Sequence, residues 1–455
     1  MRFPSLTFFS FILLFLSSCK NNNTAVTSAA DSTANATFVQ PEWMLQGNIY
    51  EVNLRQYTKE GTFNAFAQHL DRLKEMGVET LWFMPITPIS KLDRKGTLGS
   101  YYAVAGYTGI NPEYGNLEDW KNLVNAAHEK GFKVITDWVA NHTGADHPWL
   151  KSHPDFFEKD SAGNAISAFD WTDTRSLDYN NREMRDSMIA AMKYWLIETG
   201  IDGFRCDVAG EVPDDFWKQC IVELRKGRNV LMLAEGDKGS LHTAGFNISY
   251  AWDMFQMMKK IAKGERPAFA IDSIKNHNDT AFPANAMRLY FTSNHDENSW
   301  NQADYGTMPG ASHAPFAVLT QTMIRGVPLV YSGQEEPVLR KLEFFEKDPM
   351  TFSKLGRAKF YKTLLDLRKS NPALAADASF KKVVVGDEKA VYAFVREKAG
   401  KKVFVILNLS STPQIISVAD ASLHGDPYNV FMGTSEPLTN KPWSIEPWGY
   451  AIYTY

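Results

Sequence analysis

The chain has 455 residues, of which 44% are hydrophobic and 22% charged, a balance typical of a globular protein with a large core. Its formal net charge is -4 at pH 7 and it has no basic blocks, which argues against a nucleic-acid partner. Aromatic residues make up 13% of the chain. Most of their rings belong in a core, but exposed ring faces suit ligands with apolar faces, sugars included. We therefore expect a globular protein that does not bind nucleic acid.

The first 42 residues have the features of an export signal and a tether. Arg2 precedes an apolar run that is too short to span a bilayer permanently. The run ends in Leu16-Ser-Ser-Cys19, which resembles the signal of bacterial lipoproteins, whose cysteine becomes the lipidated first residue. The alternative is an ordinary cleaved signal peptide with an incidental cysteine. We expect residues 1–19 to be a lipoprotein signal peptide with Cys19 lipidated.

Residues 20–42 are rich in Asn, Ser, Thr and Ala, a composition typical of a flexible tether. With a lipid on Cys19, the protein would be exported and held at a membrane of the cell envelope. Lys20 follows the cysteine where inner-membrane lipoproteins of some bacteria carry Asp, which favours the outer membrane, facing the periplasm or the surface.

From Gly47 onward the chain repeats one pattern: an amphipathic helix, a glycine and a short apolar strand. Phe63, Phe66, Leu70 and Leu73 have helical spacing and are followed by Gly77 and a strand. Glycine suits the left-handed position that ends a helix, and continuous apolar strands are typical of a buried parallel sheet. Eight such strands are predicted, at 48–52, 80–84, 133–137, 201–207, 230–235, 246–250, 288–292 and 327–331.

Eight strands that alternate with helices predict an α/β fold, a (β/α)8 TIM barrel, over residues 43–375. The long polar stretch after the third strand predicts a small inserted subdomain at about 143–178. After the last barrel helix the pattern changes to short strands separated by turn residues. Residues 376–455 are therefore expected to form a C-terminal antiparallel β domain.

Polar residues gather at the C-terminal ends of four predicted strands, where barrel active sites lie. Arg205 and Asp207 end the fourth strand, and because positions two apart face the same side, the cation would help ionise the carboxylate. Taken singly, each of these polar residues could be a helix cap or a loop salt bridge. Together they indicate catalysis. The four strand-end groups are Asp137 with His142, Arg205 with Asp207, Glu235, and His295 with Asp296.

These segments resemble, in order, the conserved regions of the α-amylase family, glycoside hydrolase family 13. Asp137 to His142 matches D-x-x-x-N-H, and Gly203 to Asp207 matches G-F-R-x-D. Glu235 matches the acid of the fifth strand, and Asn294 to Asp296 matches N-H-D. Tyr102 stands where the family has a substrate-binding tyrosine. The similarity begins at about Gln46 and runs to the C-terminal β domain.

The resemblance implies a retaining hydrolase of α-glucosidic bonds in starch-type α-glucans or maltooligosaccharides, with endo α-1,4 cleavage foremost. Asp207 would be the nucleophile that forms a covalent glycosyl-enzyme, Glu235 the acid and base with a raised pKa, and Asp296 the ligand of sugar hydroxyls. The chemistry would need no cofactor. The residues expected to bind or support the substrate are Tyr102, His142, Arg205, His295 and Asp137.

The resemblance also implies a structural calcium ion held by Asn141 and Asp178, both of which offer oxygen ligands. The alternative is that Asn141 only hydrogen-bonds a loop of the inserted subdomain.

Specificity is left open by the sequence. Many α-amylases carry Lys-His shortly after the nucleophile, whereas this chain has Val208 to Glu211 there. A glucan transferase and a neopullulanase or other α-1,6-acting enzyme therefore remain alternatives. A non-catalytic glycan-binding protein on the same fold is a third, disfavoured because all three carboxylates are present.

Overall fold

The computed structural model describes residues 40–301 and 312–455 of the chain. The predicted signal peptide, Cys19 and nearly all of the tether lie outside the described residues. Within the described residues, no helix combines the length and the apolar character needed to cross a bilayer.

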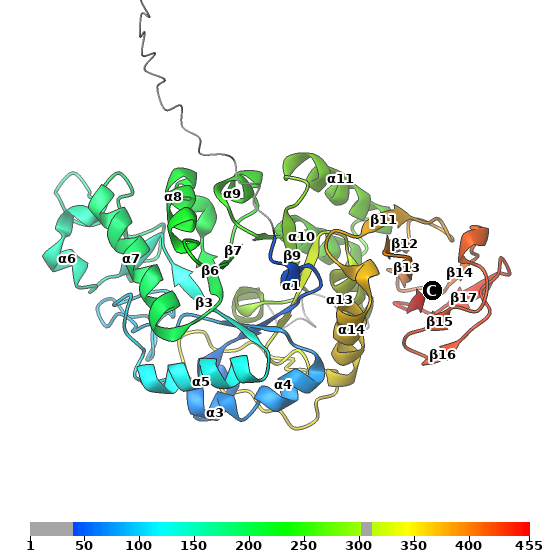
Figure 1. Ribbon diagram of the computed structural model, residues 1–455, viewed down its shortest axis with the longest axis horizontal. Coiled ribbons are helices and arrows are strands. Elements are labelled where there is room, and N and C mark those ends of the chain that lie inside the picture. Colours follow the sequence, from blue (N-terminus) through cyan, green and yellow to red (C-terminus); the bar gives the residue numbers. More distant parts are fainter. Residues whose placement is uncertain (1–39, 302–311) are drawn as a thin grey trace, which may run out of the picture. The chain divides into compact units, whose positions relative to one another are not determined.

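Parallel strands close into a barrel in the order β1-β10-β9-β8-β7-β6-β3-β2, which confirms the predicted fold class (Figure 1). Nearly every residue of these strands is buried, as expected for a sheet covered on both sides. Each predicted strand is present, with its ends shifted by a few residues at most. The strands are β1 (Ile49–Val52), β2 (Thr80–Phe83), β3 (Lys133–Val139), β6 (Gly203–Asp207), β7 (Leu231–Ala234), β8 (Ile248–Tyr250), β9 (Met287–Tyr290) and β10 (Gly326–Tyr331).

Helices between the strands surround the barrel (Figure 1). Gly77 and Gly200 end their helices in the left-handed conformation, as their positions in the sequence predict. The helix expected across Phe63 to Leu73 is instead two helices, because the His69 N–H bonds the Phe66 carbonyl three residues back and tightens the chain there. The main helices are α3 (Phe63–Ala67), α4 (Leu70–Met76), α5 (Leu117–Glu129), α7 (Arg182–Thr199), α8 (Asp214–Leu224), α9 (Gly239–Ala244), α10 (Trp252–Ala262), α11 (Ile271–Ala281), α13 (His313–Thr322) and α14 (Ala358–Ser370).

The stretch between β3 and α7 folds back on the barrel through a small antiparallel pair. β4 (His142–Gly144) pairs with β5 (Thr174–Ser176), so that His142 is opposite Ser176. A short helix, α6 (Trp149–Ser152), lies between the two strands in sequence. The pairing brings the residues just before β5 back beside the end of β3.

The C-terminal strands form an antiparallel sheet in the order β11-β12-β13-β18-β15-β16, with β14 and β17 as a separate pair. Four of these strands were not expected, because β11, β15, β16 and β17 are two to four residues long and largely exposed. The strands are β11 (Ser379–Lys382), β12 (Val391–Lys398), β13 (Lys401–Asn408), β14 (Gln414–Ile416), β15 (Tyr428–Asn429), β16 (Thr434–Ser435), β17 (Trp443–Ile445) and β18 (Tyr450–Thr454).

Candidate active site

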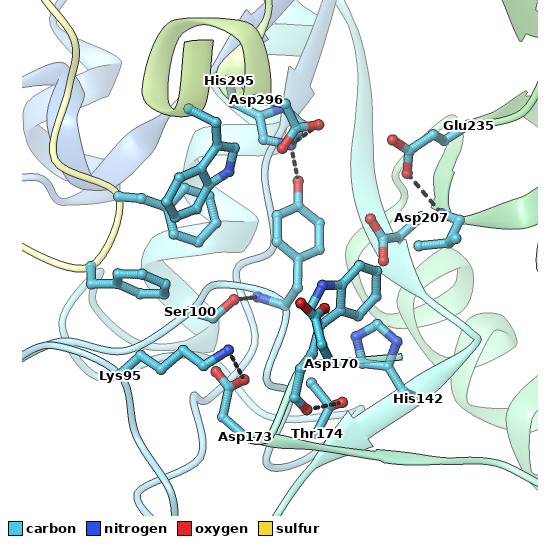
Figure 2. A pocket seen from close by; sticks show the side chains of 16 residues that line it. Lys95, Ser100, His142, Asp170, Asp173, Thr174, Asp207, Glu235, His295 and Asp296 are labelled. Carbon is cyan, nitrogen blue, oxygen red and sulfur yellow. Dashed lines mark hydrogen bonds and ion pairs between the residues drawn. The ribbon is translucent and has the colours of Figure 1, made fainter. Parts of the chain in front are cut away.

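A cavity of about 330 Å³ lies at the C-terminal ends of the barrel strands. Six of the predicted site residues line it, and Figure 2 shows the labelled ones directed at a common space. Arg205 and Asp137 lie behind its wall with fully buried side chains. The six lining residues are Asp207, Glu235, Asp296, Tyr102, His142 and His295.

Arg205 is the centre of the charged groups in this wall. Its Nη1 lies 2.9 Å from Asp137 Oδ1 and 2.9 Å from Asp207 Oδ1, donating a hydrogen bond to each. Its Nη2 forms an ion pair with Glu235 Oε2 at 2.9 Å, and its Nε donates to the Tyr250 hydroxyl at 3.2 Å. The barrel explains the convergence, because the register of β3 and β6 places Asp137 beside Arg205. One guanidinium therefore faces three carboxylates.

Val208, which follows Asp207, has a left-handed backbone with φ of 43°. This conformation is strained for a β-branched residue. It directs the Val208 N–H to Glu235 Oε2 at 2.8 Å. The segment that departs from the Lys-His pattern therefore contacts the second carboxylate through its backbone.

The pKa values of the two adjacent carboxyl groups move in opposite directions. Burial, followed by the charge of Glu235, raises the pKa of Asp207 well above its usual range. Burial also acts to raise the pKa of Glu235, but Arg205 and the Val208 N–H outweigh it and lower this pKa. The expectation of a raised pKa at Glu235 is therefore wrong. The charge of Glu235 therefore favours the protonated form of Asp207.

Tyr102 and His295 form the floor between the carboxylates. The Tyr102 hydroxyl donates to Asp137 Oδ2 at 3.2 Å and lies 2.7 Å from His295 Nε2. The two rings stack with centroids 5.5 Å apart. Asp296 Oδ2 lies 3.3 Å from the same His295 Nε2. The Tyr102 hydroxyl is thus held between Asp137 and His295, and Tyr102 lines the cavity.

His142 is buried and uncharged at neutral pH, because burial lowers its pKa to about 4. Its Nε2 has no hydrogen-bond partner among the described residues. Since a buried polar atom without a partner is costly, this nitrogen is suited to a ligand hydroxyl in the cavity.

Several residues outside the predicted catalytic and substrate-binding set complete the cavity wall. Lys95, in the loop after β2, pairs with Asp173 of the inserted segment at 3.2 Å (Figure 2). Trp300 and Phe344 contribute a second side, with ring centroids 4.9 Å apart. Trp171 packs its ring against His142 at 5.3 Å. No local pattern marks Lys95 or Phe344, because each acquires its role from a neighbour distant in sequence.

Asn141 and Asp178, the predicted calcium ligands, do not line the cavity, but their segments lie against each other. The Leu177 N–H donates to the Asn141 backbone carbonyl at 3.2 Å. Asp178 Oδ1 accepts from both the N–H and the Nδ2 of Asn180 at 2.9 Å. Within residues 40–301 and 312–455, no three His, Cys, Asp or Glu side chains gather as a metal site. The oxygen donors suit calcium, but the charged donor set is small.

Comparison with known proteins connects this geometry to one family. The model of the α-amylase catalytic domain matches residues 21–171 and 168–348 of the chain. The α-amylase MalA of Haloarcula japonica is 26% identical over 414 residues, which is 86% of this chain. The chain spans 60% of the length of MalA.

Two solved structures are similar over almost their whole length. The crystal structure of an α-amylase from Lactobacillus plantarum has a TM-score of 0.82 and 29% identity, and covers 90% of this chain and 99% of its own. A noncanonic maltogenic α-amylase from Thermotoga neapolitana has a TM-score of 0.82 and 26% identity, with the same coverage of 90% and 99%. The matching catalytic-domain model covers well over half of the chain. The chain belongs to the α-amylase family of glycoside hydrolases.

Proposed function

We propose that this protein cleaves α-glucosidic bonds in starch-type α-glucans or maltooligosaccharides, with endo α-1,4 cleavage foremost and retention of configuration. The observation that carries the proposal is the convergence of Asp207, Glu235 and Asp296 on one cavity with Arg205 behind them. Glycoside hydrolysis with retention needs one carboxylate as nucleophile and one carboxylic acid as proton donor. The activities in the relatives' names support the same substrate class.

Asp207 attacks the anomeric carbon while Glu235 gives its proton to the leaving oxygen, so that the glycosidic bond breaks as the glycosyl-enzyme forms. Glu235 then takes a proton from water, which attacks the anomeric carbon and releases Asp207. These steps require Asp207 to be ionised and Glu235 to be protonated when the substrate is bound. Asp296 binds sugar hydroxyls, and Tyr102 supports the ring.

Product analysis on amylose, pullulan and maltotriose tests the proposal. The wild type should release new reducing ends from amylose, whereas Asp207→Asn should release almost none. Identical product profiles for the two proteins would refute catalysis at this site. New oligosaccharide lengths with few reducing ends would indicate a transferase, and preferential cleavage of pullulan an enzyme of the neopullulanase type.

Glu235→Gln tests the acid and base role separately. It should reduce cleavage of amylose far more than formation of the glycosyl-enzyme from an activated aryl glycoside, because a good leaving group needs little protonation. Equal losses on both substrates would argue against this role.

We also propose that the protein is a lipoprotein held by a lipid on Cys19 in the cell envelope, at the outer membrane. The Leu16-Ser-Ser-Cys19 sequence and the following polar tether support it. Metabolic labelling with a radioactive fatty acid should mark the wild type and leave Cys19→Ser unmarked. Membrane fractionation of labelled cells then decides between the two membranes, and an unlabelled wild type would exclude the anchor.

A structural calcium ion at Asn141 and Asp178 is a further part of the proposal, supported by their oxygen donors on adjoining segments. Removing calcium with a chelator should lower the Tm of the wild type, and Asp178→Asn should make the Tm insensitive to calcium. An unchanged wild-type Tm would leave Asn141 with a hydrogen-bonding role only.

A further inference from the structure

Glu51 is a carboxylate in the middle of β1, a strand that is otherwise apolar apart from the Tyr50 hydroxyl. Its side chain is fully buried. Oε1 lies 2.5 Å from His295 Nδ1 and 3.4 Å from the His295 backbone nitrogen, which donates to it. Oε2 has no hydrogen-bond partner among the described residues. A buried carboxylate is costly unless it is paired. His295 is the hydrogen-bond partner that compensates the burial of Glu51.

The hydrogen bonds around His295 determine where its protons lie. Asp137 accepts from Arg205 at one oxygen and from Trp82 Nε1 at the other, so it acts as an acceptor. The single hydroxyl proton of Tyr102 goes to Asp137. His295 Nε2, 2.7 Å from the Tyr102 oxygen, must then be a donor. Nδ1 faces a carboxylate and must be a donor as well.

Seven charged or titratable groups face this pair, six of them from other elements and Asp296 from the segment of His295 itself. Burial alone lowers the pKa of His295, but Asp296 and then Glu51 outweigh it and raise the pKa to about 9. Arg205 acts in the opposite direction. The groups facing Glu51 or His295 are Tyr102 in the loop after β2, Asp137 on β3, Arg205 on β6, Glu235 after β7, Tyr250 on β8, Asp296 after β9 and Tyr331 on β10.

We propose that Glu51 is a positioning residue that keeps His295 protonated on both ring nitrogens. In that form Nε2 donates towards the Tyr102 oxygen and Asp296 together. A neutral ring held by Nδ1–H to Glu51 would present Nε2 as an acceptor, and the Tyr102 proton would turn away from Asp137. Glu51 thus orients two cavity residues without touching the substrate. The kinetic test of this proposal rests on the proposed function, whereas the NMR titration of His295 does not.

Glu51→Gln is the test, because it keeps the shape and removes the charge. In 15N NMR of histidine-labelled protein, the wild type should show His295 doubly protonated at pH 8, with the signal assigned by its loss in His295→Gln. In Glu51→Gln the same ring should lose its proton at a pH lower by about one unit or more. The alkaline limb of kcat/KM on maltooligosaccharides should move to lower pH with it. For a shift of one unit from a pKa of about 9, the loss of activity should therefore be about twofold at pH 8 and negligible at pH 6.

Glu335→Gln is the matched control. Glu335, in the turn after β10, is also fully buried, and it accepts from Tyr50 at 2.6 Å and pairs with Arg72 at 3.0 Å. Its loss should leave the shape of the pH profile unchanged even if stability falls. In a His295→Gln background, Glu51→Gln should add little, since the group it acts through is gone.

An unchanged pH profile in Glu51→Gln together with an unchanged His295 titration would overturn the proposal. Equal shifts in Glu51→Gln and Glu335→Gln would do the same, because they would indicate a general effect of a buried charge. If the wild type cleaved no α-glucan, the proposed function would fail, whereas the nitrogen titration would still decide the role of Glu51.

Discussion

At the scale of single residues, the candidate site depends on one cation. Arg205 is fully buried and contacts Asp137, Asp207 and Glu235, each at 2.9 Å. Removing one partner of a buried ion pair is far more costly than removing an exposed one, because the other charge is left without compensation. Asp137, Asp207 and Glu235 would lose their shared guanidinium partner at once, which favours their protonated forms.

Arg205→Met should therefore raise the pKa values of the site carboxyl groups. The acid limb of kcat/KM should move to higher pH, and the free energy of unfolding should fall by about 3–5 kcal/mol at pH 8. The sign follows from linkage: carboxyl groups with folded pKa values above the unfolded ones destabilise the fold increasingly as pH rises. Urea unfolding at pH 5 and pH 8 measures this.

Arg205→Lys is the control for charge, because it keeps a cation but not the planar fork. It should retain most of the stability at pH 8 and still lose activity. A stability loss for Arg205→Met that is the same at both pH values would contradict the electrostatic explanation.

At the scale of elements, the distance between β6 and β7 determines how Asp207 and Glu235 meet. Gly203 begins β6 where it pairs with Leu231 of β7. A Cβ at Gly203 would lie 2.0 Å from the Leu231 carbonyl oxygen, which is backbone and cannot rotate away. The absent side chain therefore allows these two strands to approach as closely as they do.

Gly203→Ala should push β6 from β7 and cost about 1–3 kcal/mol of stability, as overpacking does. Activity should fall as well, because Asp207 ends β6 and Glu235 follows β7. Thermal unfolding and kcat measure the two effects. Gly106→Ala is the matched control, since its Cβ would meet nothing within 4 Å. Equal effects of the two substitutions would contradict the steric explanation.

At the scale of the whole molecule, the C-terminal strands share a core with the barrel. One apolar cluster contains Leu289 and Leu364 of the barrel together with Phe394 and Val405 of the β sheet. Arg396 of β12 is fully buried and donates to the carbonyls of Thr322 and Ala375 at 2.7 Å. The predicted boundary between residues 375 and 376 therefore separates parts that bury one another's surface.

Removing residues 376–455 should leave an insoluble or unfolded protein, and the full chain should unfold in one calorimetric transition. Arg396→Met should lower the free energy of unfolding by about 3 kcal/mol or more, because buried carbonyls lose a charged donor. Lys401→Met, on the exposed end of the same hairpin, should change it by less than about 0.5 kcal/mol. Two separate transitions in the full chain would contradict a shared core.

Local sequence patterns were sufficient to predict the barrel strands and the position of the principal site residues. Buried strands are short apolar runs that follow helix-ending glycines, and parallel strands bring their C-terminal ends to one rim. For this reason the sequence predicts that Asp207, Glu235 and Asp296 lie on the same rim. The short C-terminal strands β11 and β15 to β17 were missed, because partly exposed strands of two to four residues have no clear apolar pattern.

The sequence by itself determined the barrel, the rim and the carboxylates on it, because each depends on the period of a strand or on the residue that ends it. Only the tertiary structure decided which charges are adjacent. Glu51 and His295 are 244 positions apart, and their contact exists only because the barrel closes. Burial and the charge of Glu235 raise the pKa of Asp207, whereas Arg205 and the Val208 N–H lower the pKa of Glu235. Electrostatic effects depend on distance in space, which residue order alone does not specify.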